Sequence, residues 1–427
     1  MLQTPKGTRD ILSEEVMIRQ EVIEKIKSVF ELYGFRPLET PALENWEVLS
    51  AKGAGGEEIL KETYNFDDKA GRKIGLRYDL TIPLARFVAM NPNLPLPFKR
   101  YQIEKVWRYG DITRTRFREF LQADIDIIGS ENMITDAEII ACTISAFNTL
   151  GFKNFFVRIN SRKILSTLME LAGIEKNKVI DVFRIIDKLD KIGFDGIEKE
   201  LNEKNIPKNS IKKLLNFLKI KGEPEVVIKK IEKIVNRNEG IEELKGIVSY
   251  LKKMKVEQKF KIDLSLARGL DYYTGPIYEV FAEEGIGSVA GGGRYDKLIG
   301  LFLGREIPAT GISFGIERIM EVMRERKMIK TERNKTKVFV VAVNDKVRDK
   351  VLEIVQDLRK NNISADFDVK GRSLSKQLEY VNSLRIPYSI IVGEKELKKD
   401  SVKLRDMKTG KEKLIKIKEL VKLIYKS

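Results

Sequence analysis

Arginine residues crowd one short run of this chain, VWRYGDITRTRFREFLQADIDIIG at 106–129, at Arg108, Arg114, Arg116 and Arg118. Two strand-like segments flank the polar turn, which predicts a hairpin. Arg108 falls in an apolar segment, where a guanidinium is costly to bury unless a phosphate or a carboxylate meets it. Phe120 follows and offers a flat ring on which a base can stack. The pattern favours a phosphate and base site over the alternative of a solvated charged hairpin.

A second segment, LSLARGLDYYTGPIYE at 264–279, sets Arg268 beside an aspartate and the pair Tyr272 and Tyr273. The glycine turn of SVAGGGRYDKL at 288–298 follows it. Glycine lets the backbone approach a ligand where any side chain would collide. The two runs together predict a binding site with a cation, hydroxyl groups and a closely approaching backbone.

A third arginine, Arg318, lies in GISFGIERIMEV at 311–322, which has the pattern of a small-residue strand entering a helix. The chain contains no histidine. This excludes a Ser-His-Asp triad, an H-E-x-x-H zinc site and an imidazole general base. Chemistry must therefore rest on Arg, Lys, Asp, Glu, Tyr and backbone groups, a set that suits phosphate handling.

Composition sets the broad class. The 427 residues, 42% hydrophobic and 33% charged, predict a globular protein of two or three domains. The net charge of +16 favours a polyanionic partner, and residues 337–427 hold 22 Lys and Arg against 13 Asp and Glu. No apolar run is long enough to span a membrane, so we expect no membrane association. The single cysteine, Cys142, excludes an intrachain disulfide, which fits a reducing cytoplasm.

The sequence patterns divide the chain into five segments, which must position the arginines, tyrosines and glycines described above. Extended stretches without regular strand–helix alternation predict a mostly antiparallel α+β fold for the catalytic unit, in two parts. A Lys-, Glu-, Ile- and Leu-rich helical insertion separates the parts, and a charged linker leads to a small α/β domain. The bounds that we expect for the first part, the insertion, the second part, the linker and the last domain are 1–159, 160–258, 259–325, 326–336 and 337–427.

The motifs, taken in order, resemble the class II aminoacyl-tRNA synthetases. GFRPLETPALE at 34–44, around Pro41, resembles their first motif, and the runs at 106–129 and 311–322 resemble the second and third. The boxes around Arg268 and the glycine turn resemble those of the histidyl-tRNA synthetase family, as do PKGTRDIL near the start and LRYDLT at 76–81. The resemblance covers nearly the whole chain and implies a class II antiparallel sheet flanked by helices, with a helical insertion and a C-terminal α/β anticodon-binding domain.

The resemblance also implies roles for individual residues. The residues expected to bind ATP are Arg108, Arg116, Phe120 and Arg318. The residues expected to catalyse the attack on the α-phosphate are Arg108 and Arg268. Binding of histidine falls to Asp79, Thr81, Gln122, Asp126, Tyr272, Tyr273, Gly291 and Gly292, with core packing as the other interpretation of Tyr272. Contact with tRNA falls to Arg372, Lys376 and Gln377 of the KGRSLSKQLEYVN segment.

The implied reaction is ATP-dependent ligation of L-histidine to tRNA(His) through an adenylate, with Mg²⁺ accompanying ATP and no metal site on the protein. The implied enzyme is a cytoplasmic homodimer. One departure concerns the second motif, where a carboxylate usually follows two residues after Arg108. Gly110 stands there, and Asp111 is the nearest substitute. The alternatives are a non-catalytic synthetase-like regulatory subunit of histidine biosynthesis and a nucleic-acid-binding accessory protein.

Overall fold

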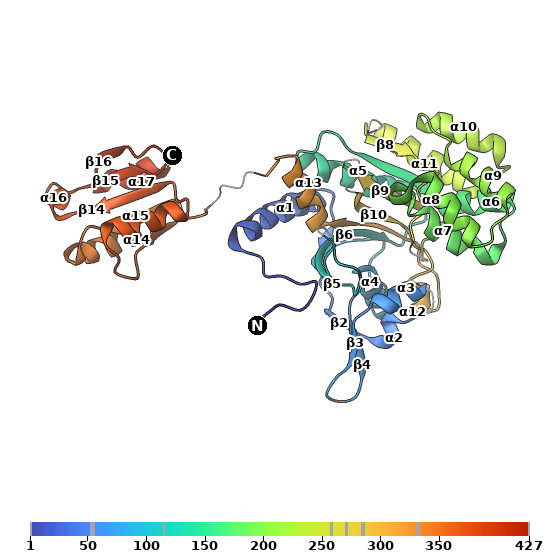
Figure 1. Cartoon of the computed structure of the whole chain (residues 1–427), viewed down its shortest axis with the longest axis horizontal. Coiled ribbons are helices and arrows are strands. Elements are labelled where there is room, and N and C mark those ends of the chain that lie inside the picture. Colours follow the sequence, from blue (N-terminus) through green and yellow to red (C-terminus); the bar gives the residue numbers. More distant parts are fainter. Residues whose placement is uncertain are drawn as a thin grey trace. The chain divides into compact units, whose positions relative to one another are not determined.

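Two compact units make up the protein, and each has its own hydrophobic cores. The computed structural model describes residues 2–51, 56–113, 116–256, 259–269, 272–282, 287–329 and 334–425, and for 56–58 the backbone alone. The larger unit contains Ile18–Ile329 and the smaller contains Lys330–Ser427 (Figure 1). Arg114 and residues 330–333 of the expected linker lie outside the described residues. No helix in the described ranges is long and apolar enough to cross a bilayer.

An eight-stranded sheet forms the centre of the larger unit, in the order β1-β5-β6-β11-β10-β9-β7-β8. All neighbouring pairs are antiparallel except β1 with β5 and β7 with β8 at the two edges. This confirms the antiparallel α+β class. The strands are β1 (Arg36–Pro37), β5 (Phe98–Trp107), β6 (Glu119–Ile128), β7 (Phe156–Ser161), β8 (Phe260–Ile262), β9 (Pro276–Phe281), β10 (Ser288–Arg294) and β11 (Ala309–Gly315).

Strand alternation divides this sheet into an apolar face and a polar face. On β6, Ala123 and Ile125 join the main hydrophobic core, whereas Asp124 and Asp126 point to the opposite side, because successive side chains of a strand alternate. Helices cover the apolar face and supply the rest of that core. They are α1 (Ser13–Leu32), α5 (Ile134–Thr149), α11 (Glu239–Lys253) and α13 (Ile316–Glu325).

A smaller three-stranded sheet, in the order β2-β4-β3, lies in the first part of the chain. Helix α4 begins at Thr81, the last residue of the LRYDLT segment, and packs against α2 and α12. The apolar residues of α4, such as Leu84 and Ala85, form a second core. The elements are β2 (Leu43–Asn45), α2 (Trp46–Leu49), α3 (Gly56–Glu62), β3 (Asn65–Asp67), β4 (Lys73–Leu76), α4 (Thr81–Met90) and α12 (Gly300–Leu303).

Six α-helices connect β7 to β8, within the stretch 162–253 that the structure describes throughout. They do not form a separate body, because Leu244 and Ile247 of α11 belong to the core beneath the central sheet. The earlier helices of the set join the second core, which also contains Tyr272 and Tyr273. These helices are α6 (Arg162–Ala172), α7 (Val179–Ile186), α8 (Leu189–Glu203), α9 (Lys208–Leu218), α10 (Pro224–Ile234) and α11 (Glu239–Lys253).

The smaller unit is a five-stranded sheet in the order β13-β12-β14-β15-β16, parallel in its first three strands. Both faces of β12 are buried: Val338 and Val340 pack under α14 and α17, and Phe339 and Val341 under α15. The elements are β12 (Val338–Ala342), α14 (Arg348–Lys360), β13 (Ala365–Phe367), α15 (Leu374–Ser383), β14 (Tyr388–Val392), α16 (Glu394–Leu397), β15 (Ser401–Asp406), β16 (Glu412–Lys416) and α17 (Leu420–Tyr425).

Candidate active site

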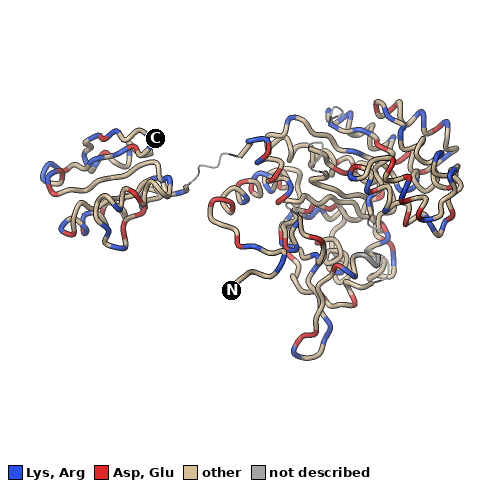
Figure 2. The backbone as a smooth tube through the Cα atoms, in the orientation of Figure 1, with Lys and Arg blue, Asp and Glu red and all other residues tan. Residues whose placement is uncertain are grey.

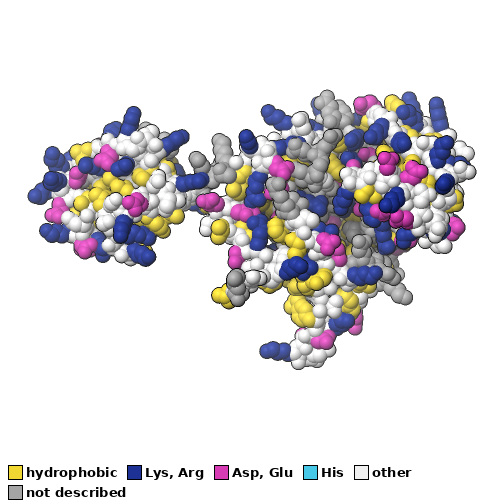
Figure 3. Space-filling view, viewed as in Figure 1, with side chains coloured by type: hydrophobic (Ala, Val, Ile, Leu, Met, Phe, Trp, Pro, Cys, Tyr) yellow, Lys and Arg dark blue, Asp and Glu magenta, His cyan; other side chains and the backbone are white. Residues whose placement is uncertain are grey.

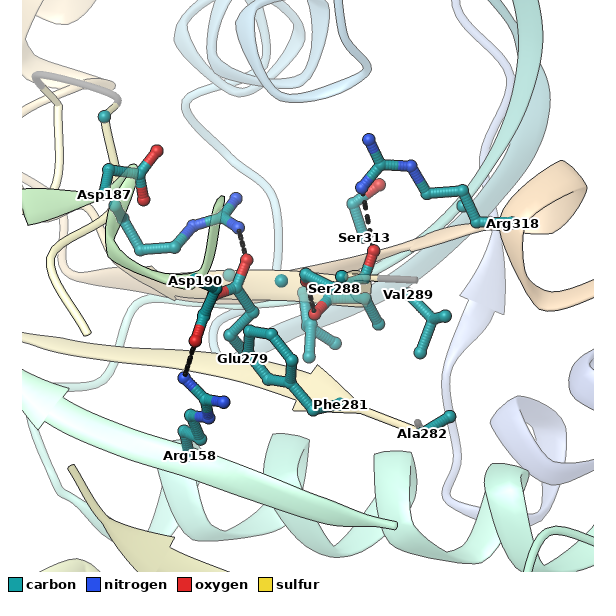
Figure 4. Close-up of a pocket in the computed structure, with 18 of the residues that line it drawn as sticks. Arg158, Asp187, Asp190, Glu279, Phe281, Ala282, Ser288, Val289, Ser313 and Arg318 are labelled. Atoms are coloured by element: carbon teal, nitrogen blue, oxygen red, sulfur yellow. Dashed lines mark hydrogen bonds and ion pairs between the residues drawn. The ribbon is translucent and has the colours of Figure 1, made fainter. Parts of the chain in front are cut away.

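A cavity of about 1530 Å³ lies over the polar face of the eight-stranded sheet. Its floor includes one row of cross-strand partners, in which Glu279 of β9, Gly291 of β10, Ser313 of β11 and Asp124 of β6 lie side by side. Figure 4 shows Glu279, Ser288, Ser313 and Arg318 around this floor. The sequence places these residues far apart, and only the strand order brings them into one site.

Six of the arginines that the structure describes line the cavity, and the charges of Arg108, Arg116 and Arg268 all act on Arg318. Nη1 of Arg318 donates to the carbonyl oxygen of Ser288 at 2.8 Å (Figure 4). Burial lowers the pKa of Arg318 below its usual range, and the nearby charges of Arg108, Arg116 and Arg268 lower it further, although Glu279 opposes them. Arginine stays charged in proteins, so this crowding is a standing repulsion that a bound anion would relieve.

Arg268 is held in an unusual conformation at the centre of this group. Its φ of 53° lies in the left-handed region, which is unfavourable for residues other than glycine and often marks functional positions. Its Nη1 lies 2.7 Å from Oε1 of Glu279. A Cβ atom at Gly291 would collide with this guanidinium. The absence of a side chain at Gly291 therefore makes room for Arg268, a reason that the sequence did not reveal.

Arg108 lies one residue beyond β5, at the mouth of the hairpin and not within its strand. Its guanidinium carbon stands 4.2 Å from the ring centre of Tyr78 and 5.1 Å from that of Phe120. Nε donates to the carbonyl oxygen of Tyr78 at 3.1 Å. These contacts fix Arg108 against two aromatic rings and direct it into the cavity that Phe120 also lines.

The opposite side of the cavity is rich in hydrogen-bond acceptors. Asp79 caps the start of α4, because its Oδ1 accepts from the backbone N–H groups of Thr81 at 3.1 Å and Ile82 at 3.0 Å. Nε2 of Gln122 donates to Oγ of Ser313 at 2.7 Å. Four buried oxygen atoms here have no hydrogen-bond partner among the described residues, namely Asp79 Oδ2, Gln122 Oε1, Asp124 Oδ1 and Asp126 Oδ2, and the last of these lies in an ion pair with Arg100. A ligand with several N–H groups would satisfy them.

Asp126 is the most heavily supported carboxylate of this side. Its Oδ1 accepts from the hydroxyl of Tyr295, and its Oδ2 lies 2.8 Å from Nη2 of the fully buried Arg100. Burial raises the pKa of Asp126, while Arg100 and Tyr295 pull it down. A Cβ atom at Gly311 would overlap the carboxylate, so Gly311 gives Asp126 the space to lean over β11.

Tyr272 and Tyr273 enclose this acceptor-rich side, with ring centres 4.8 Å apart. Both line the cavity, and both belong to the second hydrophobic core, so packing and lining are not exclusive for Tyr272. Burial raises the pKa of each hydroxyl, which keeps them protonated.

Gly292 also lines the cavity, but a Cβ atom there would collide with the backbone of β11. Its lack of a side chain serves strand packing.

A carboxylate from another element lies beside the arginine-rich hairpin. Asp111 is exposed and does not line the cavity. Glu62, at the end of α3, instead lies 3.0 Å from Nη2 of Arg116 and accepts from the hydroxyl of Tyr78 at 3.0 Å. A Cβ atom at Gly110 would lie only 2.8 Å from that same Arg116 nitrogen. Gly110 thus leaves room for the Arg116–Glu62 pair, and nothing in the sequence signalled Glu62.

In the smaller unit, the three expected RNA contacts differ in accessibility. Lys376 is exposed. Arg372 is paired with Asp368 at 2.8 Å and lies over the ring of Tyr380 at 4.0 Å. Gln377 is only 3% exposed, and it bonds the backbone of Ala342 through both of its polar atoms and the carbonyl of Arg372 at 2.7 Å. Gln377 therefore supports the Arg372 loop and is not placed to contact RNA, a correction to our expectation.

Basic residues are spread over this unit, as Figure 2 shows along the backbone and Figure 3 on the face drawn. Its parallel and antiparallel five-stranded sheet with helices on both faces agrees with the α/β domain expected after residue 337. Comparison with known families gives the same division. The description "Histidyl-tRNA synthetase" matches residues 7–319, and "Anticodon binding domain" matches residues 337–427.

Individual relatives extend over nearly the whole chain. A histidine–tRNA ligase of Aeropyrum pernix is 38% identical over 423 residues, covering 98% of this chain and 97% of the relative. The crystal structure of histidyl-tRNA synthetase from Nostoc sp. PCC 7120 is similar with a TM-score of 0.85 at 31% identity, covering 100% of this chain and 99% of that one.

A structure from Bacillus halodurans C, described as an ATP phosphoribosyltransferase regulatory subunit/histidyl-tRNA synthetase, shares the fold with a TM-score of 0.74 at 22% identity. It covers 90% of this chain and 96% of that one.

A mostly antiparallel sheet beneath an arginine-lined cavity, in a chain that also contains an anticodon-binding unit, defines the protein as a class II aminoacyl-tRNA synthetase. The family match to residues 7–319 and the relatives that cover nearly the whole chain identify one family within this class. The chain belongs to the histidyl-tRNA synthetase family.

Proposed function

We propose that the protein ligates L-histidine to tRNA(His) in two steps. The carboxylate of histidine attacks the α-phosphate of ATP and releases pyrophosphate, and the ribose of the tRNA end then takes the histidyl group from the adenylate. The observation that carries this proposal is the crowding of Arg108, Arg116, Arg268 and Arg318: burial lowers the pKa of Arg318, and the charges of the other three lower it further. Preorganised cations that face developing phosphate charge supply catalysis without an acid–base side chain.

The two sides of the cavity fit the two small substrates. On the arginine side, Phe120 would stack on adenine, Arg318 would bind the γ-phosphate and Arg268 would meet the α-phosphate at the point of attack. ATP would act as its Mg²⁺ complex, with the ion bridging the β and γ phosphates. On the acceptor side, Asp79, Thr81 and Gln122 would hold the amino group of histidine. Asp126 and Tyr273 would bind its ring.

The cavity continues into a basic and aromatic part that suits the unpaired end of an RNA. There Lys259 lies 4.8 Å from the ring centre of Phe155, and Lys261 lies 3.7 Å from that of Phe156. All four residues line the cavity. Aromatic faces and cations together bind single-stranded nucleic acid, so this part is where the tRNA end would enter.

Histidine-dependent exchange of pyrophosphate into ATP tests the first step. We expect exchange with L-histidine and none with other amino acids. A protein that binds histidine but neither exchanges pyrophosphate nor charges tRNA would support the regulatory-subunit alternative. A protein that binds tRNA but not histidine would support the accessory-protein alternative.

A shortened chain tests the role of the smaller unit. The unit has hydrophobic cores of its own, so a chain ending at Glu332, which lies outside the described residues, should keep the fold of the cavity. We expect it to retain pyrophosphate exchange and to lose most aminoacylation, chiefly through a higher KM for tRNA. Binding of tRNA by the full chain should weaken steeply with salt. Full aminoacylation by the shortened chain would contradict the anticodon-binding role.

We also propose that the enzyme is a cytoplasmic homodimer. The segment 34–44 resembles the dimerisation motif of class II synthetases. It contributes the edge strand β1 to the sheet as described, and Leu43 within it is 44% exposed. Sedimentation of the full chain should give twice the mass of one chain, and Leu43→Glu should reduce that mass. An unchanged mass for the variant would remove this segment from the interface.

A further inference from the structure

Asp124 is a third carboxylate in the acceptor-rich side of the cavity, and none of the sequence motifs assigns it a role. It lies between Gln122 and Asp126 on the polar face of β6 and is only 3% exposed. It lines the cavity, and its Oδ1 has no hydrogen-bond partner in the described part of the chain. A buried, unsatisfied oxygen at the wall of a binding cavity is costly unless a ligand donates to it.

The surroundings of Asp124 leave it less stabilised than its neighbours. Asp126 has the Arg100 ion pair and the Tyr295 hydroxyl, and Asp79 has two backbone N–H groups. Asp124 interacts with the hydroxyl of Ser313 and receives only a longer-range attraction from Arg100. Among these carboxylates it is therefore the one most readily protonated.

The charges facing Asp124 show an imbalance that histidine would correct. They come from Arg100 on β5, Asp126 on β6 and Asp79 before α4, while Tyr272 and Tyr295 stay neutral because burial raises their pKa values. Arg108 also attracts Asp79 from the arginine side of the cavity. Three ionised carboxylates against these two guanidinium groups leave one negative charge. The α-ammonium and α-carboxylate groups of histidine cancel each other, so a protonated imidazole would balance that remaining charge.

We propose that Asp124 is a specificity-determining residue of the histidine pocket, where its carboxylate and the imidazole of bound histidine share one proton. Both ring nitrogens then act as N–H donors, one toward Asp126 and one toward the Asp124 side. The proton comes from solvent or from one of the two groups, and no bond is made or broken besides. This inference rests on the proposed function, because it concerns the amino acid that the pocket binds.

Proton linkage gives the proposal a measurable signature. Burial raises the pKa of Asp124 to about 7, with Asp126 and Asp79 adding to the effect and Arg100 and Ser313 opposing it. Imidazole in solution titrates near pH ~6.5. At pH ~8 both groups are mostly deprotonated before binding, so forming the complex takes up about one proton. At pH ~5.5 both are mostly protonated, so binding releases about one.

Calorimetric titration of the full-length protein with L-histidine, in buffers of different ionisation enthalpy, counts these protons. For the unmodified protein we expect uptake at pH ~8, release at pH ~5.5 and a change of sign between them. The dissociation constant should rise about tenfold per pH unit between pH ~7.5 and ~8.5. A dissociation constant that is flat over that range, with no proton uptake, would overturn the proposal even if no variant folds.

Substitutions assign the effect to Asp124. Asp124→Asn should bind neutral imidazole, so proton uptake at pH ~8 should disappear. Ser313→Ala removes the hydroxyl that stabilises ionised Asp124 and should move the change of sign to higher pH. Asp190→Asn is the matched control, because Asp190 pairs with Arg158 on β7 at a different part of the same cavity, and it should behave as the unmodified protein does (Figure 4).

The outcomes separate this inference from the proposed function. Equal proton uptake by the Asp124→Asn variant and the unmodified protein would assign the proton elsewhere and overturn the proposal. Histidine-dependent pyrophosphate exchange without proton uptake would also overturn it and leave the ligase function intact. Absence of both histidine binding and exchange in the unmodified protein would instead remove the proposed function.

Discussion

The two sides of the active-site cavity carry opposite charges, but each brings several groups of like charge close together. Arg108, Arg116, Arg268 and Arg318 crowd one side, and Asp79, Asp124 and Asp126 crowd the other. Each side repels itself in the ligand-free protein. The difference is that guanidinium groups cannot lose their protons near neutral pH, whereas a buried carboxyl can gain one. The arginine side is therefore relieved only by an anion, and the carboxylate side by a cation or by protons.

Removal of Arg268 should give the largest loss on the arginine side. Arg268→Ala should lower kcat for pyrophosphate exchange about 10²–10³-fold, since one preorganised donor to developing charge is lost. The KM for histidine should change less. Glu279 would lose its partner, so the double variant Arg268→Ala, Glu279→Gln controls for a buried unpaired charge. An active Arg268→Ala enzyme would remove this residue from catalysis.

The carboxylate side should show the reverse selectivity. Asp126→Asn should raise the KM for histidine about 10–100-fold, because the neutral amide is a weaker acceptor for a ring N–H, and leave the KM for ATP nearly unchanged. Steady-state exchange kinetics with each substrate varied in turn measure both values. Tyr295→Phe, which removes one support of Asp126, should give a smaller change in the same direction. Equal losses for both substrates would indicate a folding defect.

Removing one of the crowded arginine charges should affect the stability of the ligand-free protein. Arg318→Met removes one of four like charges while keeping the apolar stem, so thermal unfolding of the ligand-free protein should occur at an equal or higher temperature. The KM for ATP should rise about tenfold. A large drop in unfolding temperature would show that the Arg318–Ser288 contact outweighs the repulsion.

The carboxylate side should show a pH-dependent version of this effect. A carboxyl whose pKa rises from 3.8 to about 7 on folding destabilises the folded state progressively as pH increases through that interval. Asp124→Asn should therefore stabilise the ligand-free protein at pH ~8, by on the order of 1–4 kcal/mol, and by little at pH ~4.5. Thermal unfolding at the two pH values measures this. Equal shifts at both would exclude ionisation as the cause.

Sequence patterns named many of the residues that line this cavity. Asp79, Gln122, Asp126, Arg108, Arg268 and Arg318 were all named from motifs, and all of them line one cavity. Their recognition was possible because each lies in a local pattern, such as the arginine-rich hairpin or the tyrosine pair after Arg268. The alternation of Gln122, Asp124 and Asp126 on β6 also carried a signal for Asp124, because residues two apart on a strand share a face.

Other residues of the site lie in no sequence motif that would have indicated a role for them. Glu62 reaches Arg116 from a helix more than fifty residues earlier, and Glu279 meets Arg268 across the glycine strand. The glycines themselves were expected to admit substrate, whereas Gly291 admits Arg268 and Gly292 admits the backbone of β11. Gln377 lies in a segment that resembles the tRNA-binding part of the family. Its burial against Ala342 nevertheless gives it a structural role.

The sequence by itself determined the family motifs, the alternation of strand faces and the residue types available for chemistry, because these depend on neighbours along the chain. The tertiary structure decided which of those residues share a cavity, which of their buried oxygen atoms lack a hydrogen-bond donor and which arginines repel one another. Those properties depend on strand order, cross-strand register and burial. A pKa is set by distance and desolvation in three dimensions, and spacing along the chain fixes neither.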